Sequence, residues 1–300
     1  MNDGPDHRDD VRRIVMEQLP EYSITSVEYL GEGMDNTTFE VNGELVVRLS
    51  KDPNTTTRGA QVSREAHLLA VVASISTVRV PQPVFVVPHE GCSAYKKLLG
   101  IAVVDLPCSQ RGVHVPALAA RVGMFLSSIH AIPTVQVQEF VDLDSASLSE
   151  YLSEATEFYN GLKEVFSVAQ QWAVEAFLDA PLPDGAHRAV LCHNDLSIDH
   201  ILVDPSTWDV TGIIDWSDAA ITDPAYDFAL MYRDLGPEAL EAALGHYTST
   251  VNDVNEMRER ATFVGRCKVF EDLHYGTDTQ DCSYIDSSML SMEWLFPSVN

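Results

Sequence analysis

The alternation of apolar and polar residues predicts that the first third of the chain is built mainly of β-strands. Strand-like stretches of this kind occur at residues 26–30, 37–42, 44–50, 80–88 and 94–100. Side chains alternate between the two faces of a strand, so a period of two is typical of a half-buried sheet. Glycine-containing turns separate the first three stretches, and the Asn42-Gly43 pair favours a tight hairpin.

A period of three to four residues, typical of helices, marks most of the remaining chain. The expected helices are 11–20, 63–75, 116–132, 147–180 and several from Asp227 to the end. Ser63 lies near the start of the helix that interrupts the β-rich part, and a hairpin strand returns within 209–216. This order predicts an α+β fold of two lobes, residues 1–99 and residues 100–300, joined near Lys97–Gly100.

Charge narrows the range of partners. The chain carries 19 Lys and Arg against 45 Asp and Glu, a formal net charge of −26. Such a surface repels nucleic acids and anionic membranes and attracts cationic small molecules, although acidity can also serve solubility alone. The N-terminus has no apolar signal core, and we expect no apolar run near the roughly 20 residues needed to cross a bilayer. Five scattered cysteines without a C-x-x-C motif favour a reducing cytoplasm.

A glycine-rich turn, GEGMDN, lies between the first two expected strands. Backbone amides around Gly31, Gly33 and Asn36 could approach phosphate groups closely, although such turns are often only structural. A dinucleotide-binding fingerprint would need a helix after the glycines, and a strand follows instead. The Walker A sequence is absent from the chain.

Arg48 ends the third expected strand, and Glu65 opens the next helix. A strand cation held by a helix carboxylate could direct positive charge at nucleotide phosphates, while an ordinary ion pair is the alternative. Lys51 competes for the same role. It is three residues further along, so strand alternation would direct it to the opposite face.

The stretch HNDLSIDHIL, residues 193–202, concentrates titratable side chains. If residues 196–203 and 210–214 pair as a hairpin, Asp195, His200 and Asp215 converge. His200 and Asp215 could then hold Mg²⁺ while Asp195 accepts a proton from a substrate hydroxyl. A zinc hydrolase site formed by His193, Asp195, Asp199 and His200 is an alternative, as is a purely structural polar turn.

These motifs together resemble the aminoglycoside and macrolide phosphotransferases, a family similar to protein kinases. The resemblance covers about residues 26–280, and its most specific parts are LCHNDLSIDHILVD and VTGIIDWSDAAITDPAYDFA. They match the pattern H-x-D-x-x-x-x-(N/H), then (I/L)-I-D-(W/F), then D-P-x-x-D-F. His200 stands where many members have Asn, which is closest to the aminoglycoside 2″-phosphotransferases.

The resemblance implies a protein-kinase-like fold and a role for each matched residue. Asp195 would be the catalytic base, His200 and Asp215 the Mg²⁺ ligands, and Asp227 a structural brace of the catalytic loop. Arg48 stands where protein kinases have a lysine, with Glu65 as its partner. The glycine turn would cover the phosphates of ATP or GTP, and the backbone of Lys97–Leu99 would hold the base.

The acceptor is implied to be the hydroxyl of an aminoglycoside, whose ammonium groups suit an acidic lobe. The candidate ammonium-binding residues are Asp199, Glu271, Asp272 and Asp278. Each could instead be a solvated surface acid. A macrolide, choline or another amine are alternative acceptors, and a non-catalytic nucleotide-binding pseudokinase is an alternative of another class.

Overall fold

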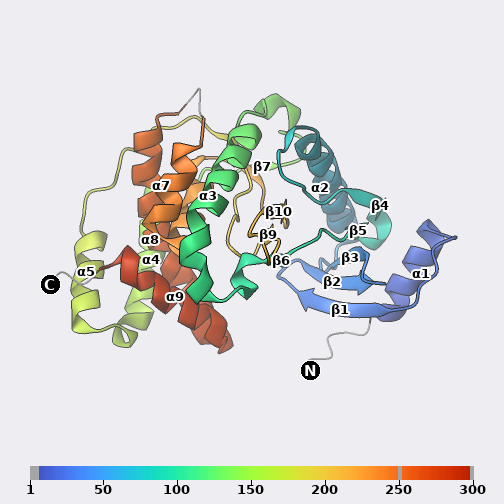
Figure 1. Ribbon diagram of the computed structural model, residues 1–300, viewed down its shortest axis with the longest axis horizontal. Coiled ribbons are helices and arrows are strands. Elements are labelled where there is room, and N and C mark those ends of the chain that lie inside the picture. Colours follow the sequence, from blue (N-terminus) through green and yellow to red (C-terminus); the bar gives the residue numbers. More distant parts are fainter. Residues whose placement is uncertain (1–6, 249–251, 298–300) are drawn as a thin grey trace.

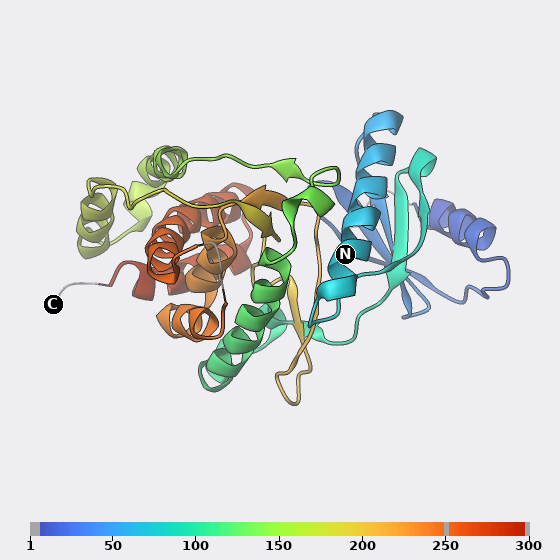
Figure 2. The same cartoon turned by 90° about the horizontal axis from the view of Figure 1, so that it is seen from above.

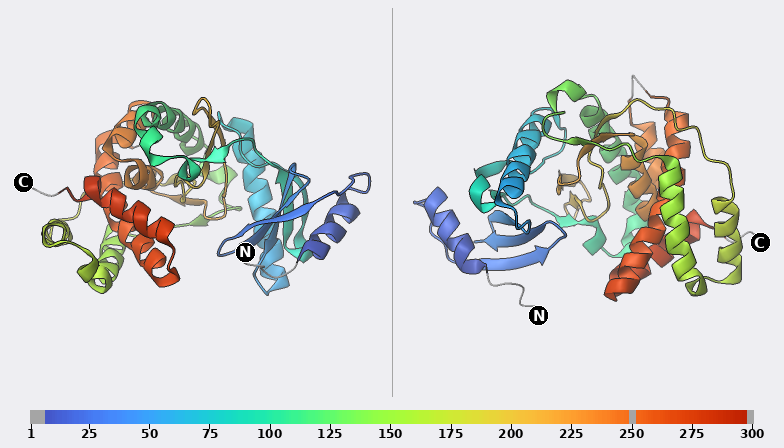
Figure 3. Two further views of the ribbon diagram at one scale, coloured as in Figure 1. Left: turned by 60° about the horizontal axis from the view of Figure 1, so that its bottom comes forward. Right: turned by 180° about the vertical axis from the view of Figure 1, so that it is seen from behind.

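A computed structural model describes residues 7–248 and 252–297, in which a β-rich N-terminal lobe is followed by a mostly helical C-terminal lobe (Figure 1). The two lobes lie side by side along the longest axis of the molecule, and the described chain begins and ends at opposite ends of it (Figure 3). The α+β two-lobe prediction is therefore confirmed.

The N-terminal lobe is a five-stranded antiparallel sheet with two helices. The strands follow the order β1-β2-β3-β5-β4. Their bounds are Val27–Glu32 (β1), Asn36–Val41 (β2), Leu45–Ser50 (β3), Pro83–Val87 (β4) and Cys92–Lys96 (β5). Helix α1, Arg8–Gln18, packs its buried Val11, Ile14 and Val15 into the core of this sheet. Helix α2, Thr55–Ile75, crosses towards the other lobe (Figure 2).

The C-terminal lobe contains the remaining helices and two small three-stranded sheets, β10-β9-β6 and β7-β11-β8. The strands are Ile101–Ala102 (β6), Asp142–Leu143 (β7), Val190–Cys192 (β8), Ile201–Val203 (β9), Val210–Ile213 (β10) and Ala220–Thr222 (β11). The helices are Cys108–His130 (α3), Leu148–Leu162 (α4), Val168–Leu178 (α5), Ala225–Leu235 (α6), Pro237–Gly245 (α7), Val254–Thr279 (α8) and Cys282–Leu295 (α9).

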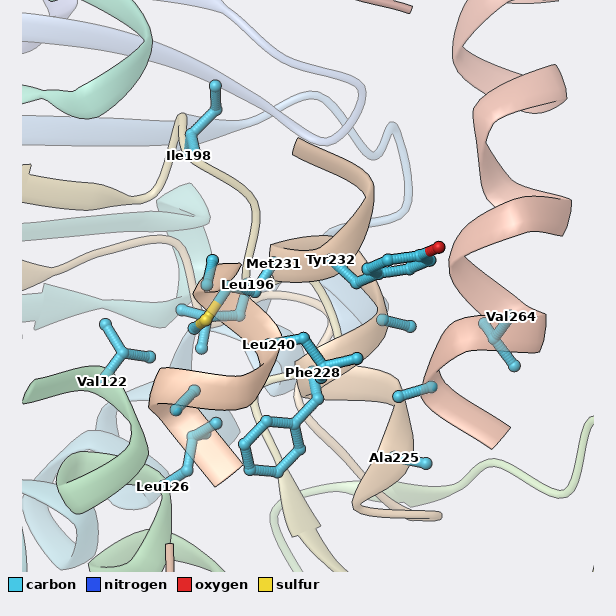
Figure 4. Close-up of a cluster of buried hydrophobic side chains, with 14 of the residues drawn as sticks. Val122, Leu126, Leu196, Ile198, Ala225, Phe228, Met231, Tyr232, Leu240 and Val264 are labelled. Carbon is cyan, nitrogen blue, oxygen red and sulfur yellow. The ribbon is translucent and has the colours of Figure 1, made fainter. Parts of the chain in front are cut away.

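The core of the C-terminal lobe fixes the loop between β8 and β9. Leu196 and Ile198 of that loop are buried with Phe228 and Met231 of α6 and with Val122 of α3 (Figure 4). Burying two apolar side chains of one short loop stabilises it by about 3 kcal/mol or more. The polar residues between them are therefore held in place by packing beneath them.

Three helix predictions need correction. The helix expected from Pro116 begins eight residues earlier, at Cys108, and Pro116 lies inside it. The helix expected from Ser63 begins at Thr55, because Asn54 caps it by accepting hydrogen bonds from the amides of Thr56 and Thr57. The single helix expected over 147–180 is two helices, α4 and α5, joined by a short 3-10 turn. Each begins with its own capping box, at Ser147 and at Ser167.

Helix α3 also corrects the expectation about apolar runs. Within the described residues, the segment Gln110–His130 is long and apolar enough to cross a membrane by length and composition. In this fold the apolar side chains of α3 serve as the core of the C-terminal lobe, where Leu118, Val122 and Phe125 are buried. The expectation failed because a long core helix meets the same criteria.

Candidate active site

Asp227 of α6 holds the start of the loop that follows β8. Its carboxylate accepts hydrogen bonds from the backbone amides of His193, at 3.0 Å, and Asn194, at 2.8 Å. His130 of α3 binds the same carboxylate at 3.0 Å. Burial opposes ionisation of Asp227, yet the bond from His130 and the nearby imidazoles lower its pKa. The predicted role of Asp227 as a structural brace is thus borne out by its geometry.

His193 is fully buried and is not free to bind a metal. Its Nε2 contacts the carbonyl oxygen of Ile214 at 3.0 Å, and its Nδ1 accepts from the amide of Asp195 at 3.4 Å. Burial lowers the pKa of His193 to about 4, so its ring is neutral. Asp199 is exposed and lines a cavity with Arg233 and Asp272, away from His193. The four residues of the zinc alternative therefore do not converge on one metal.

Asp195, His200 and Asp215 do converge, as the expected hairpin requires. β9 and β10 pair antiparallel, with Ile201 opposite Ile213. His200 Nδ1 lies 2.7 Å from the carbonyl oxygen of Asp195 and 3.4 Å from its carboxylate. The other ring nitrogen, Nε2, lies 3.9 Å from Asp215 Oδ2. The imidazole of His200 thus stands between the two carboxylates.

The carboxylates of Asp195 and Asp215 differ in electrostatic environment. Burial raises the pKa of Asp195 to about 6, although His200 acts in the opposite direction. Burial also acts to raise the pKa of Asp215, but Arg48 and His200 outweigh it and lower the value to about 2. Such separated pKa values suit a proton acceptor beside a permanently charged ligand.

Asp215 is held in a strained backbone conformation by side chains from both lobes. Its φ of 60° is uncommon outside glycine and asparagine. Oδ1 accepts from Ser217 Oγ at 2.7 Å and from Arg48 Nη2 at 3.1 Å. Arg48 also donates to Glu65 at 2.6 Å and to Ser217 at 2.7 Å. The strand cation therefore connects α2 of the N-terminal lobe to the loop after β10.

Lys51 lies elsewhere. Its Nζ pairs with Glu32 at 2.6 Å and donates to the carbonyl oxygen of Gly33 at 3.1 Å. Strand alternation had predicted this separation from Arg48. In this conformation Arg48 is the cation next to Asp215, and Lys51 braces the glycine-rich turn.

The other expected nucleotide-binding residues lie along the N-terminal lobe and its exit. Gly33 donates its amide to the carbonyl of Asn36, closing the turn between β1 and β2. A Cβ at Gly31 or Gly33 would meet no atom within 4 Å, so the protein itself does not require glycine there. Lys97 pairs with Glu40, and Leu99 is exposed, in the linker between β5 and β6.

Gly100 ends this linker. Its φ is 121°, and a Cβ there would collide with Thr211 of β10. A side chain at this point would force the linker away from β10, so glycine allows the two lobes to meet closely.

The four candidate ammonium-binding acids do not form one group. Asp199 and Asp272 line the same cavity of about 50 Å³, together with Tyr284 and Arg233. Arg233 pairs with both Asp234 and Asp272, at 2.8 Å from the latter. Burial nevertheless raises the pKa of Asp272 to about 7. Glu271 pairs with Lys268 at 2.6 Å.

The fourth acid, Asp278, stands apart from the cavity. Its side chain is exposed and lies 3.5 Å from His274, one turn away on α8. Of the four residues expected at a shared ammonium site, the structure therefore brings only Asp199 and Asp272 together.

Sequence reasoning missed Ser217 and Asp218. Ser217 bridges Arg48 and Asp215. Burial and the nearby charges of Asp215 and Asp35 raise the pKa of Asp218. Both belong to the quoted IIDWSD stretch, so proximity to Asp215 was the available signal. The bridging contact itself depends on Arg48, 169 residues away, which no local pattern indicates.

Within the described residues, a second cluster of side chains lies close enough together to hold a metal ion. His130, Cys192 and Asp227 are buried with ligand atoms within 4.8 Å of one another. These groups already bind neighbours: His130 contacts both Asp227 and Tyr247, and Cys192 lies against the carbonyl of Thr222. Burial raises the pKa of the Cys192 thiol, which therefore stays protonated. This cluster is part of the brace.

Comparison with known proteins agrees with this geometry. A stretch of 57 residues is 40% identical to the uncharacterized protein YcbJ of Bacillus subtilis strain 168, covering 19% of this chain and 18% of that protein. The GDP complex of wild-type aminoglycoside 2'-phosphotransferase-IIIa is 23% identical with a TM-score of 0.72, over 96% of this chain and 98% of that chain.

The macrolide 2'-phosphotransferase MphH from Brachybacterium faecium is 20% identical with a TM-score of 0.63, over 97% and 99% of the two chains. At these identities the two structures show that the kinase-like fold is shared. The model of the phosphotransferase enzyme family matches residues 26–261, which is more than half of the chain. The protein therefore belongs to the phosphotransferase enzyme family.

Proposed function

We propose that the protein transfers a phosphoryl group from a nucleoside triphosphate to a hydroxyl of a cationic small molecule, with an aminoglycoside as the best candidate. The observation that carries this proposal is the row of Asp195, His200 and Asp215, with His200 3.4 Å from one carboxylate and 3.9 Å from the other. A base, a metal ligand pair and a phosphate-directed cation are the parts that phosphoryl transfer requires.

Asp195 is the proposed catalytic base. Asp195 lies near the start of the loop between β8 and β9, which Asp227 and buried Leu196 fix, so it can hold an acceptor hydroxyl in line with the phosphate. Near neutral pH a carboxyl group with a pKa of about 6 is mostly ionised and able to accept a proton.

His200 and Asp215 are the proposed Mg²⁺ ligands, and their donor atoms fit that role. The contact between Nδ1 and a backbone carbonyl turns His200 Nε2 towards Asp215. Burial acts to lower the pKa of His200, but Asp195 and Asp215 outweigh it and raise that pKa, so a metal ion would replace the proton on Nε2. Asp215 is ionised at neutral pH, as a hard cation requires. When bound, the ion neutralises phosphate charge.

The nucleotide is proposed to bind in residues 1–99, and residues 100–300 carry the catalytic loop and the acceptor site. The turn that holds Gly31, Gly33 and Asn36 would lie over the phosphates, and Arg48, held by Glu65, would contribute positive charge. The backbone of Lys97–Leu99 would bind the base of ATP or GTP. The GDP complex of the aminoglycoside relative supports a nucleotide in this fold.

An aminoglycoside acceptor is favoured by the net charge of −26 and by exposed Asp199, which lines one cavity with Asp272 and with Arg233, the partner of Asp272. Glu271 and Asp278 would contribute at longer range. A macrolide 2'-phosphotransferase is the second candidate, because MphH shares the fold. We also propose a cytoplasmic location, where nucleoside triphosphates are available, with nucleic acids and anionic membranes disfavoured as partners by charge.

The test is a phosphate-transfer screen with ATP and GTP as donors and with aminoglycosides, macrolides and choline as acceptors. Product mass identifies the phosphorylated compound, and Asp195→Asn serves as the inactive control. We expect an aminoglycoside to be phosphorylated, and we expect this transfer to require Mg²⁺. Transfer only to a macrolide would move the protein to the second candidate. If the purified protein contained zinc and hydrolysed a substrate without transferring phosphate, both candidate functions would be contradicted.

A further inference from the structure

Helix α2, which carries Glu65, is held by both lobes. Near its start Gly59 packs so closely on the N-terminal lobe that a Cβ would lie 2.7 Å from the carbonyl oxygen of Pro88. Near its end Leu68, Leu69 and Val72 are buried in the core of the C-terminal lobe. Figures 1 and 2 show the helix between the five-stranded sheet and the C-terminal lobe. The position of Glu65 therefore depends on contacts with both lobes.

Arg64, the residue before Glu65, makes the polar contacts to the C-terminal lobe. Its Nε donates to the carbonyl oxygen of Phe140 at 3.1 Å, and its Nη2 donates to Asp142 at 2.7 Å. One turn further along α2, the ring of His67 stacks on Phe140 with centroids 5.2 Å apart. These contacts fasten the middle of α2 to residues 140–142.

This attachment leads directly to the Asp215 loop. Asp142 begins β7, which pairs in parallel with β11, and Asp142 lies opposite Ala220. β11 continues the chain five residues after Asp215. Arg48 joins the same two parts from the other side, since it binds both Glu65 and Asp215. The chain of contacts therefore forms a ring around the space between α2 and the Asp215 loop.

That space is a cavity of about 160 Å³, lined in part by Arg64, Glu65, Phe140, Trp216 and Ser217. Close packing normally fixes the distance between two elements, but a cavity leaves their facing atoms without contact partners. At the level of Glu65, the distance from α2 to the Asp215 loop is thus set by the polar contacts at the rim of the cavity.

We propose that Arg64 is a positioning residue for phosphoryl transfer, which acts by holding α2 against β7 so that Glu65 keeps Arg48 beside the metal-binding loop. Arg64 itself contacts no reacting atom. The side chain of Asp142 is 85% exposed, so its ion pair contributes little alone, and the bond to the Phe140 carbonyl gives the contact its direction. This inference rests on the proposed function, because it assumes that Arg48 faces nucleotide phosphates.

The test compares Arg64→Gln with Arg58→Gln. Arg58 lies on the same helix, but its guanidinium binds the carbonyl of His89 within the N-terminal lobe at 3.2 Å. The readouts are the Kd of a fluorescent ATP or GTP analogue and kcat/KM for the nucleotide. We expect Arg64→Gln to raise Kd and to lower kcat/KM by about fivefold to tenfold each, the range for the net loss of one ordinary hydrogen bond. Arg58→Gln should stay within about twofold of wild type.

A second comparison separates positioning from general stability. In a Glu65→Gln background, adding Arg64→Gln should change Kd and kcat/KM by less than twofold, because the group through which Arg64 acts is already lost. Arg64→Lys, which keeps the charge, should recover part of the loss and guards against misfolding of the Gln variant. Equal effects of Arg64→Gln and Arg58→Gln, or a full further loss in the Glu65→Gln background, would overturn the inference.

The same assays distinguish this inference from the proposed function. If the wild-type protein binds and uses a nucleotide but Arg64→Gln matches it, only the role of Arg64 is refuted. If the wild-type protein binds neither ATP nor GTP analogues, the proposed function is refuted, and the role of Arg64 in it falls as well.

Discussion

Single residues decide the chemistry around Asp195, and Asp227 illustrates how. Its buried carboxylate accepts two backbone amides at the turn of the catalytic loop and a third hydrogen bond from His130. A buried acceptor with three donors is stabilising only while each donor keeps its partner. Replacing one carboxylate oxygen of Asp227 should therefore disturb the loop that positions Asp195.

Asp227→Asn should destabilise the protein by about 3 kcal/mol. The NH₂ group of asparagine would face a hydrogen-bond donor where the aspartate had an acceptor, and that donor would lose its partner. Urea denaturation followed by circular dichroism measures the change. Glu157→Gln, a comparable loss of charge on an exposed face of α4, is the control and should change stability by less than about 0.5 kcal/mol. An Asp227→Asn variant as stable as the control would show that the brace is dispensable.

If Asp195 is the proposed base, it sets the acid limb of the pH profile. A base must be unprotonated to act, and the pKa of Asp195 is raised to about 6, so activity should fall as the pH drops through that value. Bound Mg²⁺ would favour the carboxylate and shift the limb to lower pH. The measurement is kcat/KM from pH 4.5 to 8 in buffers of constant ionic strength. A profile that stays flat down to pH 4.5 would argue against Asp195 as the titrating base.

The sequence predicted the convergence of Asp195, His200 and Asp215 because hairpin pairing follows from local spacing. It also separated Arg48 from Lys51 by strand alternation. It could not predict that Ser217 joins Arg48 to Asp215, or that Lys268 and Arg233 occupy the acids Glu271 and Asp272. Such contacts depend on how distant helices pack, which a linear pattern does not encode.

Among the elements, α2 begins eight residues before its predicted start, as α3 also does, and it carries Glu65 of the site. Three consecutive threonines and Gly59 weaken the helical pattern in its first turns, so periodicity alone placed the start at Ser63. The cap at Asn54 carries the missing information, because its side chain binds the amides of Thr56 and Thr57. Strand bounds, in contrast, were within one or two residues for β1, β2 and β3.

Asn54→Ala should destabilise the protein by about 1 kcal/mol, since two amides at the start of α2 lose their acceptor. Asn54→Asp keeps an oxygen at the same place and should remain close to wild type. Both are compared by the midpoint of urea unfolding. An alanine variant that matches the aspartate variant would mean that water replaces the cap without cost.

At the scale of the whole molecule, two hydrophobic cores and one dominant charge shape the function. The sheet and α1 form the smaller core, and the C-terminal lobe forms the larger one with the end of α2. The sequence predicted the two lobes, but not that a helix from the first would complete the core of the second. The net charge of −26 would draw a polycation towards the protein.

Salt dependence tests this attraction. For an aminoglycoside, kcat/KM should fall appreciably as ionic strength rises to 0.15 M, where screening acts beyond about 8 Å. A macrolide, with one cationic group, should show a shallow response. Asp199→Asn should raise KM more than it lowers kcat, while Asp278→Asn, which removes the same charge outside the cavity, should change KM less. A flat aminoglycoside response with both KM values unchanged would assign these acids to surface solvation.

The most direct test of the central claim is the rate of phosphate transfer by Asp195→Asn. With ATP or GTP, Mg²⁺ and an accepted aminoglycoside, we expect turnover to fall by about two to four orders of magnitude relative to wild type, the range for a lost general base. Nucleotide affinity should stay unchanged, because the proposed role of Asp195 is to bind the acceptor hydroxyl and not the nucleotide. Near-normal turnover by this variant on every accepted compound would contradict the assignment of Asp195 as the base.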